Sequence, residues 1–119
     1  MIADSVACLA SAARFKDGFA TLQDAEIKTR MDKFIVKSWH YKRDNLGDVF
    51  PESYYRERIG LIADDVMAID RRLVSFDHHG QIRSIDYNGV ISLTAARVAA
   101  LSRDFDRLQA EFEMIKRAN

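Results

Sequence analysis

A heptad pattern at the C-terminal end constrains this chain more than any other feature. Between residues 91 and 115, apolar side chains recur in alternating steps of three and four. One core position holds Ile91, Val98, Phe105 and Phe112, and the other holds Thr94, Leu101, Leu108 and Ile115. This spacing predicts a long helix with a narrow apolar stripe, which we call the seam. Polar residues flank the seam, which favours another helix over a membrane as its partner.

Two arrangements would cover the seam. Copies of the chain could pair through it, or the helix could fold back so that the seam covers the chain's own core. We expect the first arrangement, which makes the chain an oligomer, and keep the second as the alternative. Val98 with Leu101 would suit a two-helix seam, but Phe105 and Phe112 need more core volume than two helices usually offer.

Composition narrows the class of protein. The chain has 119 residues, which suits one domain with a modest core. Its 18 basic and 18 acidic residues cancel and are interspersed, so we expect no nucleic-acid partner. No stretch reaches the ~18 consecutive apolar residues of a membrane span, so we expect no membrane partner either. The single cysteine, Cys8, rules out an internal disulfide and suits a reducing compartment.

The first half of the chain mixes helix, strand and loop patterns. Residues 23–33 are typical of a helix with charges on one side. Residues 33–42 favour a strand because they are rich in aromatic and β-branched side chains. Residues 43–57 contain the only proline and predict a loop.

The second half predicts a hairpin before the long helix. Residues 58–63 suggest a short buried strand, and residues 64–69 suggest one or two helical turns. Two β-rich runs around Gly80 predict a β-hairpin. The expected fold is therefore α+β, a small mixed domain with a hairpin and a long C-terminal coiled-coil helix. We expect a lead-in at 1–10, from an upstream region or an expression start, a head at 11–88 and the heptad helix at 89–119.

Three other groups of residues could carry chemistry. His78 and His79 could bind a metal with a third ligand, or could form a solvated turn. Asp64 and Asp65 are adjacent and so do not face each other as a catalytic carboxylate pair would. No glycine pattern indicates a phosphate loop, and we expect neither a metal nor a cofactor.

Aromatic residues offer a further candidate surface. Trp39 and Tyr41 fall on one face of a predicted strand and are expected in the core. Tyr54, Tyr55, Arg56 and Arg58 form a basic aromatic cluster, which could touch a partner or a sugar or could pack on its own domain.

Three short patterns in a fixed order carry a resemblance to a known family. Residues 11–16 read SAARFK, residues 58–66 read RIGLIADDV, and residues 84–91 read SIDYNGVI and lead into the heptads. Together they resemble the C-terminal intramolecular chaperone domain of phage tail spikes, tail fibres and endosialidases. The same domain occurs in the myelin regulatory factor family of membrane-bound transcription factors. The resemblance covers about residues 11–117.

The resemblance implies a self-cleaving Ser–Lys pair. Ser11 would be the nucleophile, Lys16 its base, and the bond between Ala10 and Ser11 the one that breaks. A serine hydroxyl needs a neighbour to take its proton, and a lysine can do so only when neutral. A regular helix would place these two residues about 140° apart, so the pair requires a turn. The chain departs from the family pattern at Ala12, Arg58, Asp64 and Asp65, which leaves open whether it cleaves.

The resemblance also implies a function and a partner. The domain would form a homotrimer, bring an upstream β-rich tail fibre or spike segment into register, and then release itself. It would act in the host cytoplasm during virion assembly, or stay on the virion tail if it is not cleaved. The alternatives are a non-catalytic trimeric coiled-coil interaction module and a release domain of a membrane-bound transcription factor. In a parallel trimer, Glu111 and Lys116 would pair between neighbouring helices.

Overall fold

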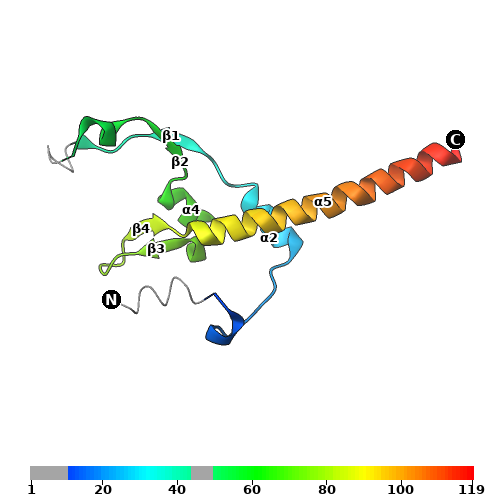
Figure 1. Ribbon diagram of the computed structural model, residues 1–119, viewed down its shortest axis with the longest axis horizontal. Helices are drawn as coiled ribbons and strands as arrows, with labels where there is room; N and C mark the ends of the chain where they lie inside the picture. The colour runs from blue at the N-terminus through cyan, green and yellow to red at the C-terminus, as the bar shows by residue number, and fades with distance from the viewer. Residues whose placement is uncertain (1–10, 44–49) are drawn as a thin grey trace.

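The computed structural model describes residues 11–43 and 50–119, and shows a small α+β head from which one long helix projects (Figure 1). The elements follow in the order η1 (Ala13–Phe15), α2 (Asp24–Met31), β1 (Lys37–Trp39), η3 (Glu52–Tyr55), β2 (Arg58–Gly60), α4 (Ala63–Ile69), η4 (Arg71–Leu73), β3 (Val74–Phe76), β4 (Ile82–Ile85) and α5 (Tyr87–Ala118). The expected α+β class, with a C-terminal helix, is confirmed. The long axis of the molecule, 71 Å, follows α5.

A small core joins α2, α4, the β3–β4 hairpin and the first half of α5. Its buried residues are Ile27, Val66, Leu73, Val74 and Leu93. Helix α5 begins where the Asp86 side chain accepts a hydrogen bond from the Gly89 N–H at 3.2 Å. Gly89 also lets α5 approach closely, because a Cβ there would lie 2.8 Å from Leu73 Cδ2. The helix starts at Tyr87, two residues before the predicted boundary.

Helix α2 crosses α5 on the side away from the seam. Leu22 packs beside Ile27, which is the hydrophobic contact expected where a chain enters a helix. Glu26 Oε1 accepts from the Gln23 N–H at 2.9 Å and so satisfies a donor at the start of α2. Arg103 of α5 pairs with Asp24 at 2.9 Å across the crossing. The helix predicted at 23–33 is therefore confirmed, with its ends at Asp24 and Met31.

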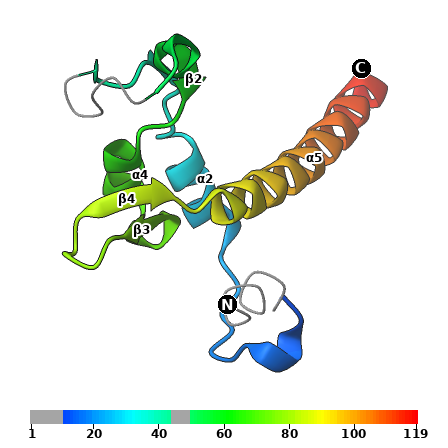
Figure 2. The ribbon, with the colours of Figure 1, turned by 60° about the vertical axis from the view of Figure 1, so that its left-hand side comes forward.

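The strands form two separate antiparallel pairs. β1 pairs with β2, with Ser38 opposite Ile59, and β3 pairs with β4 as the predicted hairpin. At the hairpin turn, Asp77 Oδ1 accepts from the backbone N–H groups of His79 and Gln81 at 2.9 Å each. Gly80 has φ +80°, a conformation that glycine adopts without strain. The β1–β2 pair forms an arm that leads away from the head (Figures 1 and 2).

Two sequence predictions about this arm were wrong. The strand predicted at 58–63 is not buried, since the pair has no covering layer and Ile59 is 79% exposed. Trp39 and Tyr41 are not part of the head core, because β1 ends at Trp39 and both rings lie among the aromatic residues of the arm. The strand predicted at 33–42 is also shorter, since only Lys37–Trp39 has a partner. Part of the loop predicted at 43–57, residues 44–49, lies outside the described residues.

Candidate functional site

The seam of α5 is a continuous, exposed apolar surface. Its apolar members are between 49% and 64% exposed, and they are Ile91, Val98, Leu101, Phe105, Leu108, Phe112 and Ile115. Thr94, the polar member, is exposed and donates its hydroxyl to the Val90 carbonyl at 2.8 Å. The stripe runs over 25 residues, from Ile91 to Ile115, or roughly 36 Å at the rise of an α-helix. Exposed apolar surface on this scale marks a contact site.

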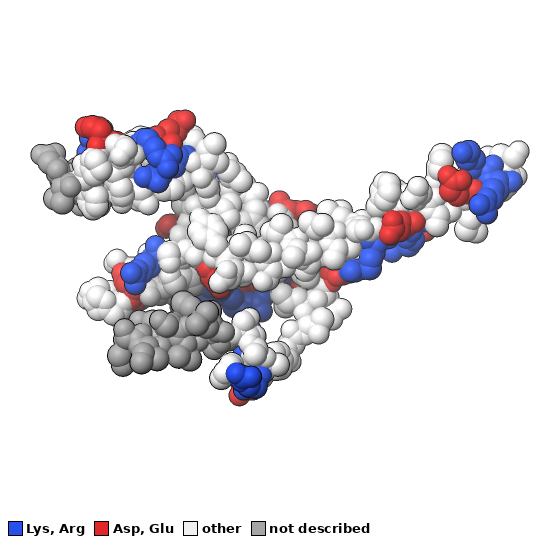
Figure 3. Space-filling view, viewed as in Figure 1, with Lys and Arg blue, Asp and Glu red and all other residues white. Residues whose placement is uncertain are grey.

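The seam does not cover the chain's own core. The head instead contacts the opposite side of α5, where Leu93 is 7% and Ala100 is 3% exposed. Every residue from 101 to 112 is exposed. The alternative in which the helix folds back over its seam is therefore wrong for the single chain. Charged groups of both signs are interspersed on the face shown in Figure 3.

The predicted Ser–Lys pair lies on the segment before α2. The 3₁₀ turn η1 closes through hydrogen bonds from the Phe15 N–H to the Ala12 carbonyl at 3.1 Å and from the Lys16 N–H to the Ala13 carbonyl at 3.0 Å. The turn brings Lys16 Nζ to 3.5 Å from Ser11 Oγ, which is the outer limit of a hydrogen bond. The turn that the pair requires is thus present. Ala10, on the other side of the predicted scissile bond, lies outside the described residues.

Solvent reaches both members of this pair in the single chain. Every residue from 11 to 21 is exposed, including Phe15 at 54% and Phe19 at 71%. A lysine becomes a base when its surroundings exclude water and so favour the neutral amine. The single chain therefore supplies the proximity of a Ser–Lys pair without its desolvation.

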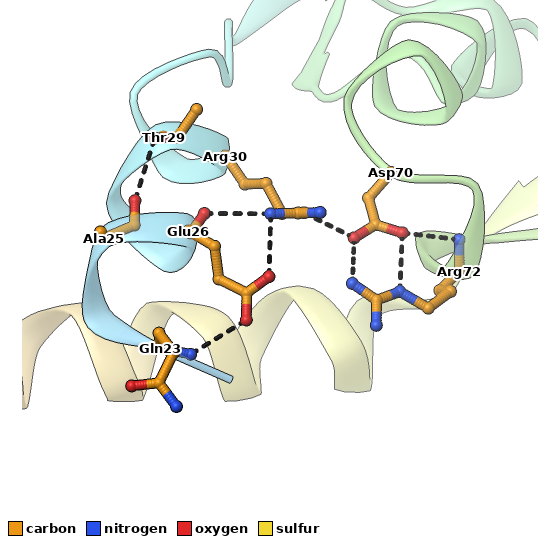
Figure 4. Close-up of polar contacts among 7 residues, drawn as sticks. All are labelled: Gln23, Ala25, Glu26, Thr29, Arg30, Asp70 and Arg72. Atoms are coloured by element: carbon orange, nitrogen blue, oxygen red, sulfur yellow. Dashed lines mark hydrogen bonds and ion pairs between the residues drawn. The ribbon is translucent and has the colours of Figure 1, made fainter. Parts of the chain in front are cut away.

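A nearly buried carboxylate holds α2 to the turn after α4 (Figure 4). The Asp70 side chain is 8% exposed and pairs with Arg30 at 2.8 Å and with Arg72 at 2.7 Å. Its other oxygen accepts from the Arg72 backbone N–H at 2.9 Å. The hydrogen bonds from Arg72 hold the pKa of Asp70 far below its usual range, against the opposing effect of burial. Arg30 and Asp70 are 40 residues apart, so no local pattern predicted this contact.

A pocket of about 470 Å³ opens between α2, η4 and α5. Its floor is apolar and includes Leu22, Ile27, Leu73, Leu93 and Ala96. Thr21, Asp70, Arg72 and Ser92 add polar groups to the lining. Because these residues come from three separate segments, the sequence did not indicate the pocket.

The remaining candidates pack on themselves or lie in solvent. The Tyr41 and Tyr54 rings stack at 4.5 Å, and Phe50 stacks on Tyr54 at 4.4 Å. Arg58 lies over both tyrosine rings. Burial raises the pKa of Tyr54, with further contributions from Tyr41. The basic aromatic cluster therefore packs largely within its own arm.

In the described structure, His78 and His79 have no third ligand that would complete a metal site. The His78 and His79 rings lie 3.9 Å apart at an exposed turn. Across residues 11–43 and 50–119, no three histidine, cysteine or acidic side chains gather as a metal site would require. Asp65 instead pairs with Lys37 at 2.8 Å and ties the arm to α4.

The chain matches no protein-family model, and no curated protein matches it. Within the described parts of the chain, no helix has both the length and the apolar character needed to cross a membrane. The features of the chain that bear on function are the seam, the Ser–Lys geometry and the sequence resemblance.

Proposed function

We propose that this chain is a homotrimeric folding chaperone for a β-rich tail fibre or tail spike segment joined to its N-terminal side. The observation that carries the proposal is the exposed seam of α5, seven apolar side chains that the chain's own core does not use. The aromatic bulk of Phe105 and Phe112 supports three helices over two. The sequence resemblance implies that the folding substrate is a tail fibre or tail spike segment. It also implies that the chaperone acts in the host cytoplasm during virion assembly.

The physical role of the trimer is to lower the entropic cost of starting the fibre. Strands whose partners lie in other chains cannot cover their apolar faces until three chains meet. Non-local pairing of this kind nucleates slowly, because chain entropy is lost before contacts form. Three α5 helices that associate first would hold three upstream segments at one end and in register. The head would sit between the helices and the client.

Release would follow from the Ser–Lys pair. In the proposed step, Lys16 takes the proton of the Ser11 hydroxyl, and Ser11 Oγ attacks the carbonyl carbon of Ala10. The peptide C–N bond breaks, the proton passes to the freed amine of Ser11, and the resulting ester is hydrolysed by water. The 3.5 Å approach of Lys16 Nζ to Ser11 Oγ supports this assignment. Because solvent reaches the pair in one chain, we expect cleavage only in the oligomer.

The chaperone role is tested in cis with the full gene. Deleting residues 11–119, or breaking the seam with Phe105→Asp, should convert soluble trimeric fibre into aggregates or monomers. Soluble, trimeric fibre from the deleted form would show that this domain is not its chaperone.

Cleavage is tested separately by intact mass. The parent should lose the part of the chain that ends at Ala10, while Ser11→Ala and Lys16→Ala should each retain it and remain trimeric. Ser11→Thr is the matched control, since it keeps a hydroxyl nucleophile. Cleavage that persists in Ser11→Ala would exclude the mechanism.

A second candidate is a trimeric coiled-coil interaction module without chemistry. The exposure of Ser11 and Lys16, together with Ala12 in place of the family's acidic residue, favours this candidate over a cleaving domain. Gene context separates the candidates. A long β-rich sequence upstream supports the chaperone, whereas a DNA-binding region upstream with a membrane span downstream supports a release domain of a transcription factor.

A further inference from the structure

The pocket between α2 and α5 has the character of a receptor for an apolar side chain. At about 470 Å³ it is large for so small a core, and its floor is formed by buried residues such as Ile27 and Leu93. An apolar cavity of roughly 150 Å³ accommodates benzene, so this pocket has room for an aromatic ring. Three of its four polar side chains are already engaged, since Asp70 pairs with Arg72 and the Ser92 hydroxyl donates to the Asn88 carbonyl. The pocket therefore suits a neutral apolar group.

The same chain carries a matching side chain that its own fold leaves uncovered. Phe15 is 54% exposed, and its only ring contact in the described structure is the Arg14 guanidinium at 4.5 Å. The segment that carries it leaves the start of α2 and lies apart from the head in both ribbon views (Figures 1 and 2). Gly18, at φ +67° with open space around its Cβ position, gives this segment a bend that other residues rarely adopt.

Each copy thus has a projecting ring and an apolar pocket at different places on its surface. Phe15 lies seven residues before Leu22, which lines the pocket of the same chain. A fully extended segment of this length spans roughly 25 Å, which is therefore the greatest distance between Phe15 and that pocket. A contact between two different patches is heterologous, and it closes into a ring when the rotation between copies permits. In a trimer held together by the seam, three such contacts would close into a ring.

We propose that Phe15 of one copy inserts into the pocket between α2 and α5 of the neighbouring copy. The inference rests on the proposed trimer and adds a second contact to it, one that fixes the segment carrying Ser11 and Lys16. Insertion would cover Phe15 and place the adjacent Lys16 against a protein surface. The exclusion of water that the Ser–Lys pair lacks in one chain would then come from the neighbour.

Disulfide trapping between two differently marked chains tests the contact. All proteins carry Cys8→Ser. One chain carries Arg14→Cys, next to the inserted ring, and the other carries Ser92→Cys, at the pocket lining. After the two are co-expressed and mildly oxidised, we expect a linked species of two chain masses.

The matched control replaces Ser92→Cys with Ser102→Cys, at an exposed position on the same helix outside the pocket. Its yield of the linked species should be at least fivefold lower. Phe15→Ala should lower the yield to the level of this control, whereas Phe15→Leu should retain most of it.

The outcomes separate this inference from the proposed function. Light scattering on the same samples reports the oligomer. Trimers in which the Ser92→Cys chain links and the Ser102→Cys chain does not support insertion between copies. Trimers without the link, or a double variant that forms only an internal disulfide within one chain, overturn the insertion and leave the trimer standing. Monomers in the parent overturn the trimer and the insertion together.

Discussion

The two apolar sides of α5 differ in what covers them. On one side, where α5 packs on α2 and η4, Leu93 and Ala100 are nearly fully buried. On the other, Val98 and Phe105 are 60% and 63% exposed although they lie on the same helix. The head core holds five buried residues, whereas the seam exposes seven apolar ones. The same helix therefore faces a covered core on one side and solvent on the other.

The two halves of this helix therefore have different surroundings in the single chain. The first half of α5 completes the fold of its own head, and the second half, from Asp104 to the end, lies clear of the head. A helix of this length without tertiary contacts is marginal in water, because most helical stability in proteins comes from packing of an apolar face. The head-facing side should thus determine the stability of each chain, and the seam should determine association. Four experiments test this division.

The largest effect is expected where a charge enters the seam. Phe105→Asp should convert the trimer to monomers at micromolar concentration, because three carboxylates would be buried without partners. Light scattering and sedimentation measure the mass. Ala110→Asp is the matched control, since it adds the same charge to the outer side of the same helix, and it should remain trimeric. A monomeric parent protein would show that the seam does not hold a trimer.

The next effect separates the two sides within one chain. In a Phe105→Asp background, Leu93→Ala should lower the free energy of unfolding by about 2–4 kcal/mol, because it leaves a cavity in the head core. Leu101→Ala in the same background should cost about 0.5 kcal/mol or less, since that side chain is half exposed in the single chain. Urea unfolding followed by circular dichroism measures both. Equal costs would mean that the head and the seam share one core.

A smaller effect concerns the ion pairs that hold α2 in place. Asp70→Asn should cost about 2 kcal/mol near neutral pH, because the hydrogen bonds to Arg30 and Arg72 weaken. Since Arg72 lowers the pKa of the folded-state carboxyl, this stabilisation is present above the unfolded pKa of about 3.9 and is lost as the pH falls through the lower folded value. The two proteins should therefore become more alike in acid.

Urea titrations at neutral and acidic pH measure this convergence. Asp104→Asn, which removes an exposed pair with Arg107 on the distal half of α5, is the control and should change little at either pH. A constant difference between the parent and Asp70→Asn across the acid range would contradict the assignment.

The smallest effect tests the orientation of the seam. Glu111 and Lys116 flank it and would pair between parallel helices, which a double-mutant cycle with Glu111→Gln and Lys116→Gln should report as well under 1 kcal/mol. The coupling should fall as salt is added, because both groups are exposed. Zero coupling in low salt would favour antiparallel helices.

Several elements could be predicted because their signals are local. The helices at α2 and α5 follow from apolar periodicity, and the β3–β4 hairpin follows from two β-rich runs around Gly80. The wrong predictions concern residues that were expected to be buried because they have a high propensity for β-strands. Ile59 has the β-branched shape of a core strand, but its strand belongs to an uncovered pair. Trp39 and Tyr41 are aromatic, but they pack on other rings of the arm instead of on the head.

By itself, the sequence determined that α5 is a long helix with a continuous seam, because a periodicity of three and four residues acts through neighbouring turns of one helix. The pairing of Ser11 with Lys16 was a hypothesis that the resemblance to a known family implied. Only the tertiary structure decided which side of α5 the head covers, that Arg30 meets Asp70, and that a pocket lies between α2 and α5. These features join residues far apart in the chain, so they depend on how the elements pack and not on any local pattern.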